Sequence, residues 1–180
     1  MSLPAIETPR LILRRWREED VAPFHAMGQD AEVMRFLGPP MTTDDCRAVV
    51  VRQNTIAGEF GRCFFALERR GDGAFLGFCG VKPGPAGTPV EGEAEIGWRL
   101  ARAAWGRGYA TEAARAALDA EWGRGTTQVL AITVPANARS RAVMERLGMT
   151  HEPAGDFDHP ALAPGDPLRR HVLYRIERPA

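Results

Sequence analysis

Residues 105–112, W-G-R-G-Y-A-T-E, restrict the possible folds of this chain more than any other segment. They follow an apolar strand pattern at residues 93–100 and open an alanine-rich helix pattern at residues 110–122. Gly106 and Gly108 let the backbone approach a ligand closely, and a helix start offers free N–H groups and the positive end of its dipole. The pattern suits a phosphate or pyrophosphate, although for two glycines alone an ordinary glycine turn before a helix is the more common explanation.

Two common phosphate motifs do not match this turn. A P-loop needs a lysine after its last glycine, and the only lysine, Lys82, lies elsewhere. A dinucleotide-binding turn needs a third glycine where Thr111 stands, and an acid at the end of the next strand. Residues 122–144 contain neither Asp nor Glu. A nucleotide-binding oxidoreductase module is therefore disfavoured.

The hydrophobic periodicity of the remaining chain alternates between strand and helix patterns. The predicted strands lie at residues 10–16, 62–68, 74–82, 93–100, 128–134 and 171–177. The predicted helices lie at residues 21–27, 31–37, 110–122 and 139–147, with one more from a Thr42 cap to a stop at Gly58. This order predicts a mixed sheet with helices packed on it. No repeat or linker divides the chain, so residues 1–180 are expected to form a single domain.

Composition excludes several kinds of partner. The 23 basic and 23 acidic residues cancel, which argues against a nucleic acid or a membrane surface as partner. No apolar run approaches the roughly 18–20 residues that cross a bilayer, and the first residues do not resemble a secretory signal. The three cysteines form no metal-ligand spacing with the histidines, so we expect no metal. Their odd number favours a reducing cytoplasm.

Four separate motifs resemble the GNAT superfamily of acetyl-CoA-dependent N-acyltransferases, closest to its RimJ/RimL-like branch of ribosomal-protein N-terminal acetyltransferases. In chain order they are T-P-R-L-I-L-R-R-W-R-E-E-D, D-A-E-V-M-R-F-L-G, E-I-G-W-R-L followed by W-G-R-G-Y-A-T-E-A, and N-A-R-S-R-A-V-M-E-R-L-G-M. The resemblance covers nearly the whole chain. It implies an α/β (α+β) fold with a mixed, mostly antiparallel central sheet and helices on both faces. It also implies direct acetyl transfer from acetyl-CoA to a primary amine.

The resemblance also implies which residues hold coenzyme A (CoA). The superfamily's pyrophosphate motif, Q/R-x-x-G-x-G/A, falls on residues 105–110, with Trp in the first place as is usual in this branch. The strand near residue 99 is then expected to pair with the pantetheine arm through its backbone. The predicted CoA-binding residues are Trp98, Arg99, Leu100, Trp105, Gly106, Arg107, Gly108, Tyr109, Ala110, Thr111, Asn137 and Ser140.

Acetyl transfer needs a base for the ammonium and an acid for the thiolate. Glu93 and Glu95 share one strand face by alternation, and Glu95 is the better base candidate because it is nearer the expected thioester. A solvated strand face explains both side chains equally well. The resemblance places Ser140, one of two serines, near the CoA sulfur, so we expect Ser140 or water to be the acid. Many members instead carry a tyrosine where Met144 stands.

Other candidates have competing structural explanations. Asn137 is a good helix N-cap, and Tyr109 is more readily an aromatic packed under the turn than a catalytic group. The C-terminal pattern D-F-D-H-P…L-R-R-H-V-L-Y-R resembles a subgroup of the same branch, which implies an acceptor pocket lined by Asp156, Asp158, His159 and His171. A lone histidine is more often a surface or core residue. Trp16 and Phe36 are explained equally well by core packing and by an acceptor role. The loss of the tyrosine leaves a non-catalytic acetyl-CoA sensor as the alternative function.

The acceptor is not specified by these patterns, and a protein N-terminus, an amino acid, a polyamine and an aminoglycoside all remain open. A homodimer is expected from the resemblance alone. Residues 96–111 and 122–144 each hold three arginines and no acid, which predicts a local positive field around CoA. These arginines are Arg99, Arg102, Arg107, Arg124, Arg139 and Arg141.

Overall fold

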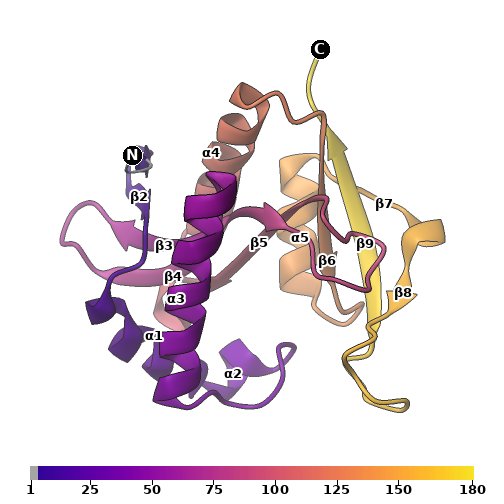
Figure 1. Ribbon diagram of the computed structural model, residues 1–180, viewed down its shortest axis with the longest axis horizontal. Helices are drawn as coiled ribbons and strands as arrows, with labels where there is room; N and C mark the ends of the chain where they lie inside the picture. Colours follow the sequence, from indigo (N-terminus) through magenta and orange to yellow (C-terminus); the bar gives the residue numbers. More distant parts are fainter. Residues whose placement is uncertain (1–3) are drawn as a thin grey trace.

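A twisted mixed sheet runs through the centre of the molecule in the computed structural model, which describes residues 4–180 (Figure 1). Its strands are β1 (Ile6–Glu7), β2 (Leu11–Arg14), β3 (Phe64–Arg69), β4 (Phe75–Pro83), β5 (Ala94–Leu100), β6 (Gln128–Thr133), β7 (Thr150–His151), β8 (Phe157–Asp158) and β9 (Arg170–Glu177). Their order is β1-β2-β3-β4-β5-β6-β9-β7, with β8 paired to β9. Every pair except β5–β6 is antiparallel, so the predicted fold class is confirmed.

Helices cover both faces of this sheet. They are α1 (Val21–Gly28), α2 (Ala31–Met34), α3 (Thr43–Phe60), α4 (Tyr109–Gly123) and α5 (Ala138–Leu147), with 3-10 turns at Glu18–Asp20, Arg102–Ala104 and Pro153–Gly155. In Figure 1 α3 runs in front of the sheet and α4 lies behind it. Among residues 4–180, no helix has both the length and the apolar character that crossing a membrane requires.

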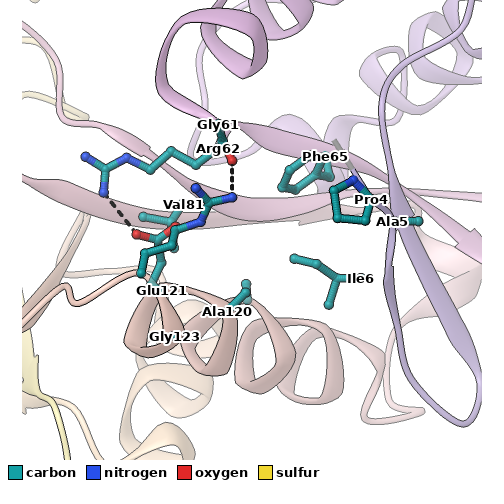
Figure 2. Close-up of a pocket in the computed structure, with 12 residues that line it drawn as sticks. Pro4, Ala5, Ile6, Gly61, Arg62, Phe65, Val81, Ala120, Glu121 and Gly123 are labelled. Atoms are coloured by element: carbon teal, nitrogen blue, oxygen red, sulfur yellow. Dashed lines mark hydrogen bonds and ion pairs between the residues drawn. The ribbon is translucent and has the colours of Figure 1, made fainter. Parts of the chain in front are cut away.

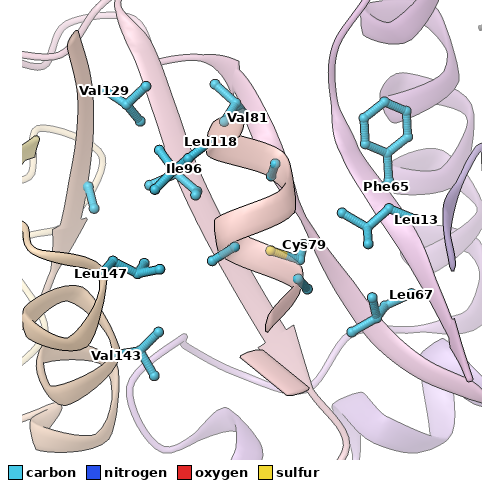
Figure 3. Close-up of a cluster of buried hydrophobic side chains, with 14 of the residues drawn as sticks. Leu13, Phe65, Leu67, Cys79, Val81, Ile96, Leu118, Val129, Val143 and Leu147 are labelled. Atoms are coloured by element: carbon cyan, nitrogen blue, oxygen red, sulfur yellow. The ribbon is translucent and has the colours of Figure 1, made fainter. Parts of the chain in front are cut away.

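Each helical layer covers its own apolar cluster. On the α4 side, the buried residues include Ile96, Leu118 and Val129, and Figure 3 shows these side chains between the helix and the strands. On the α1 and α3 side, Trp16 and Phe24 pack edge to face with ring centroids 5.0 Å apart. Trp16 is only 4% exposed, so core packing accounts for it.

The parallel pair β5–β6 separates almost at once. A single register pair, Glu95 with Leu130, joins the two strands. On its other side β5 is paired with β4 along its whole length, from Ala94 to Leu100. The C-terminal half of β5 therefore faces β6 across an open slot, and its backbone groups there have no ladder partner within the described residues.

Most predicted elements are confirmed, with ends shifted by a few residues. The Thr42 cap forms with Asp45, whose carboxylate accepts from the Thr42 N–H at 2.9 Å. The predicted stop at Gly58 is wrong, because α3 continues to Phe60 and ends on Gly61, whose φ of 66° is left-handed. The short strands β1, β7 and β8 were not predicted, since two residues are too few for a periodic pattern. The prediction that the first residues are not a secretory signal concerns residues 1–3 among others, and these three lie outside the described residues.

Candidate active site

A cavity of about 1130 Å³ opens at the C-terminal end of β5, beyond the point where β5 and β6 pair. Its walls are the end of β5, the turn before α4, the first turns of α4 and the outer face of α5. The turn after α2 closes one side with Phe36 and Leu37. Of the predicted CoA-binding residues, Arg107 alone is absent from the cavity lining.

The glycine turn presents its backbone to this cavity. Gly106 and Gly108 have φ of 71° and 76°, a region that residues with a Cβ rarely adopt. A Cβ on Gly106 would meet nothing within 4 Å, so the backbone there faces open space. Gly108 is the N-cap of α4 and supplies no side-chain cap, which leaves the first N–H groups of a 15-residue helix free for a ligand.

Two side chains hold the turn in place. The Trp105 indole N–H donates to the Leu100 carbonyl at 2.9 Å, and the Arg139 guanidinium lies 4.3 Å from the centre of the Trp105 ring. These contacts join the end of β5, the turn and the start of α5 into one wall. The aromatic residue in the first motif position therefore has a positioning role.

An ion pair fixes the start of α4 to the β1–β2 connection. Arg10 donates through Nε to Glu112 at 2.6 Å and through Nη1 to the Arg107 carbonyl at 3.0 Å. Thr8 donates to the same carboxylate at 2.6 Å. Tyr109 is 7% exposed with the Arg10 guanidinium 4.7 Å from its ring centre, so it is packed under the turn. Sequence reasoning missed this anchor, because its partners lie about a hundred residues apart.

The start of α5 places two predicted residues against the cavity. The Asn137 side chain accepts from the Ser140 N–H at 3.3 Å and donates to Thr133 at 3.2 Å, so Asn137 is the N-cap. Ser140 lines the cavity, and within residues 4–180 its hydroxyl has no hydrogen-bond partner. Met144 is 2% exposed and belongs to the core. The roles of Asn137 and Ser140 toward CoA stay predictions.

Glu95 is a buried, ion-paired carboxylate. It is 8% exposed, and Lys82 Nζ lies 2.6 Å from its Oε2. Burial raises the pKa of Glu95, and the Lys82 charge offsets part of that rise, with a weaker contribution from His159. The interpretation as a solvated strand face is therefore wrong for Glu95. It is right for Glu93, which is exposed, lies just before β5 and meets Gln128 at 3.3 Å.

Glu95 is not one of the residues that line the large cavity. It lies at the closed end of the slot, where the pair with Leu130 holds β5 and β6 together. Gly97 and Arg99 follow it on the same strand face, and the Phe64 ring fills the space above Gly97, where a Cβ would meet it at 2.6 Å. The carboxylate is thus placed beyond the end of the slot, on the α3 side of the sheet.

The C-terminal candidates divide into two groups. Asp156 accepts from the Leu173 N–H at 3.1 Å and meets His151 at 2.9 Å, and Asp158 lies near Arg169 and Arg170. These acids hold the C-terminal segment together.

His159 and His171 form a tilted ring pair with centroids 5.1 Å apart. Burial lowers the pKa of His171, and the charge of His159 acts in the same direction. The charge of His159 also contributes to lowering the pKa of Glu95. The acceptor role of the two histidines stays a prediction.

The predicted positive field is only partly present. Of the six arginines, Arg99 and Arg139 line the cavity. Arg124 was wrongly predicted, because it lies at a second hollow of about 300 Å³ on another part of the molecule. There Glu121 pairs with Arg62 at 3.0 Å, and Arg124 donates to the Gly61 carbonyl (Figure 2). Two other arginines line the cavity instead, Arg115 on α4 and Arg146 on α5, and the sequence analysis missed both.

Arg107 is absent from the cavity lining, and the other two predicted arginines are bound elsewhere. Arg102 lies 3.4 Å from Asp30, and Arg141 donates to the Tyr174 hydroxyl at 3.1 Å. Within the described residues 4–180, no group of three or more His, Cys, Asp or Glu side chains is arranged to hold a metal ion.

The fold and this glycine turn at the mouth of a split sheet define an acyltransferase. The model of the acetyltransferase (GNAT) domain matches residues 10–150, so the chain belongs to the GNAT acetyltransferase family, as the motifs predicted. It is 33% identical over 146 residues to the protein YkkB of Bacillus subtilis (strain 168), which covers 79% of this chain and 83% of that protein.

Solved structures agree with this assignment. The crystal structure of the acetyltransferase from Agrobacterium tumefaciens str. C58 has a TM-score of 0.79 at 27% identity, covering 99% of this chain and 96% of that one. The ribosomal L7/L12 alpha-N-protein acetyltransferase RimL, solved in complex with coenzyme A, has a TM-score of 0.77 at 17% identity, covering 97% and 98%. The second likeness shows a shared fold alone.

Proposed function

We propose that residues 1–180 form a single-domain N-acetyltransferase that transfers an acetyl group directly from acetyl-CoA to a primary amine. The observation that carries this proposal is the coincidence of three features at one cavity: the split of β5 from β6, the left-handed glycine turn and the uncapped start of α4. The split suits the pantetheine arm of CoA, and the glycine turn and the helix start suit its pyrophosphate.

The described residues suit two parts of CoA, the pyrophosphate and the pantetheine arm. The N–H groups at residues 106–110 and the start of α4 suit a pyrophosphate, and Arg115, Arg139 and Arg146 add positive charge to the same cavity. The unpaired edge of β5 suits the amides of a pantetheine arm. When bound, acetyl-CoA supplies the acetyl group as a thioester.

The reaction then needs two proton transfers, which the chain's own residues provide. Glu95 takes the proton of the acceptor's ammonium, either directly or through water, so that the neutral amine forms the new C–N bond while the C–S bond breaks. Its raised pKa strengthens it as a base, and the ion pair with Lys82 keeps it ionised. The second proton, which the amine nitrogen loses as the C–N bond forms, passes through Ser140 or water to the departing thiolate.

The cysteines support direct transfer over a covalent acyl-enzyme. Cys46, Cys63 and Cys79 are buried free thiols. Burial raises the pKa of Cys63 and of Cys79 to about 12, and it also raises the pKa of Cys46, so none is a reactive thiolate near neutral pH. Free thiols also favour a reducing compartment, and we propose the cytoplasm.

Thiol release tests the proposal. The protein is incubated with acetyl-CoA and a peptide, amino acids, a polyamine or an aminoglycoside, and free CoA is measured over time. Release that depends on an amine supports acetyl transfer. Saturable binding of acetyl-CoA without release on any amine favours the non-catalytic sensor, and no binding by calorimetry contradicts both.

A further inference from the structure

Arg99 is a half-buried cation without an anionic partner in the described residues. Its Nε and Nη1 atoms are inaccessible to solvent and donate no hydrogen bond within residues 4–180. The guanidinium lies between two aromatic rings, with its central carbon 5.4 Å from the Phe78 ring centre and 5.9 Å from that of Phe24. The same side chain lines the large cavity.

Other arginines with buried nitrogens differ in one respect. Nε of Arg169 and Nε of Arg175 also lack a hydrogen bond, but each has a carboxylate close by, at 3.4 Å and 2.7 Å respectively. The buried Arg14 pairs with both Asp20 and Glu68. Among the described residues, Arg99 has no carboxylate within ion-pair distance, so its charge is uncompensated in the protein alone.

An uncompensated buried charge is costly. Burial lowers the pKa of Arg99 to about 10, which still leaves the guanidinium charged at neutral pH. The ionisable group that affects it is the Cys46 thiol, which is buried and neutral. A ligand carboxylate or phosphate would neutralise this charge, because a guanidinium binds either group through two parallel hydrogen bonds.

Strand alternation assigns this anion to the acceptor and not to CoA. Trp98 and Leu100 belong with the α4 face and the proposed CoA slot, whereas Arg99 lies against Phe24 and Phe78 on the opposite face. Glu95, the proposed base, lies on that same opposite face four positions earlier, roughly 13 Å along the strand. The phosphates of CoA have their own cradle at the glycine turn, beyond the end of β5.

We propose that Arg99 binds a carboxylate of the acceptor, so that the acceptor is a small primary amine that also carries a carboxylate group. This inference rests on the proposed acetyl transfer and names its substrate class. Amino acids belong to this class, whereas polyamines and aminoglycosides do not. The cost of keeping Arg99 unpaired in the free protein is then offset when substrate binds.

The probes are chosen to isolate the carboxylate. Glycine, β-alanine, γ-aminobutyrate and 6-aminohexanoate are compared with their amides, which have the same amine and the same length. Leucine and leucinamide add an apolar side chain. A neighbouring carboxylate stabilises the ammonium, so the amides hold more neutral amine at a given pH. A preference for the acids therefore opposes intrinsic reactivity and reports recognition.

The variants are Arg99→Met, which keeps length without charge, and Arg99→Lys, which keeps charge without the planar fork. Arg47→Met is the matched control, because Arg47 is an exposed arginine on α3 that pairs with Glu18. We expect at least one acid to exceed its amide in kcat/KM by about 10- to 100-fold. Arg99→Met removes that preference, Arg99→Lys keeps part of it and Arg47→Met leaves it unchanged.

Stability separates recognition from a structural role. Because the charge is unpaired, Arg99→Met is expected to melt at the same temperature as the parent or higher. A lower melting temperature with equal loss on every amine would show a structural role and overturn the proposal. So would a parent protein that prefers amides or polyamines.

If no amine is acetylated, the proposed transfer fails, and calorimetry with CoA present still decides this inference. Binding of an acid but not its amide, lost in Arg99→Met, supports it, and equal or absent binding overturns it.

Discussion

Lys82 Nζ lies 2.6 Å from Oε2 of Glu95, and the two residues are cross-strand partners on β4 and β5. Lys82 is the only lysine of the chain, and its ammonium also lies 4.9 Å from the centre of the Phe64 ring. Burial raises the pKa of Glu95 and the lysine limits that rise. The pair therefore tunes the carboxylate that we propose as the base.

Replacing this lysine is expected to shift the pH dependence of catalysis. In Lys82→Met the carboxylate loses the charge that lowers its pKa, so Glu95 stays protonated to a higher pH. The acidic limb of kcat/KM therefore moves to higher pH, measured with an acceptor amine of low pKa so that its own titration does not mask the limb. Lys82→Arg keeps the charge and most of the parent profile. A limb that does not move in Lys82→Met contradicts the coupling.

The two neighbouring glutamates provide a matched test of the base. Glu95→Gln keeps size and removes the proton acceptor, so kcat is expected to fall about 100- to 10,000-fold with little change in the affinity for acetyl-CoA. Glu93→Gln changes an exposed side chain just before the same strand and is expected to keep parent activity. Equal effects of the two substitutions in steady-state kinetics would remove Glu95 from the mechanism.

Substitution of Gly106 tests whether the glycine turn binds the pyrophosphate of CoA. Alanine at a φ of 71° costs about 1–2 kcal/mol and adds a methyl group where the backbone faces open space. We expect Gly106→Ala to weaken acetyl-CoA binding by about tenfold in calorimetry. Gly58→Ala is the control, because Gly58 lies inside α3 with nothing within 4 Å of its Cβ position. It is expected to bind normally and to be stabilised by about 0.5–1 kcal/mol. If Gly106→Ala binds acetyl-CoA as tightly as the parent, the glycine turn is not the pyrophosphate site.

His171 is expected to make stability depend on pH. Its folded pKa lies below 6.5 because burial disfavours the charged ring. As pH falls below 6.5, the unfolded chain gains a proton that the folded protein does not, so this contribution to stability is lost. His171→Phe keeps the stacked contact with Phe157, whose ring centre lies 5.6 Å away, and removes the titration. Between about pH 7.5 and about pH 5.5 the parent should lose more unfolding free energy than the variant. Equal losses of unfolding free energy in the parent and in His171→Phe would show that burial does not shift the pKa of His171.

Features that depend on neighbours in sequence were predictable. The Asn137 cap, the Thr42 capping box and the left-handed Gly148 that closes α5 each involve residues within one helical turn. The strand, turn and helix around Gly106 follow from periodicity and glycine placement for the same reason. The end of α3 was misjudged because a helix tolerates an interior glycine such as Gly58, and sequence does not reveal which glycine adopts a positive φ.

Features that depend on tertiary contacts were not predictable. Glu95 was equally compatible with a solvated face, because only the register of β4 against β5 brings Lys82 to it. Arg99 was assigned to CoA from its position in a motif, and its burial between two rings follows from the packing of α1. Arg124 was counted with the CoA arginines from local charge alone, although the helix end carries it to a different hollow.

Mass analysis of the acceptor tests the central claim most directly. The parent protein is incubated with isotopically labelled acetyl-CoA and an amine, and the amine product and free CoA are quantified together. The account predicts one labelled acetyl group on the amine nitrogen for each CoA released, and a loss of both signals in Glu95→Gln. Release of CoA without labelled amine, or equal labelling in Glu95→Gln, would contradict it.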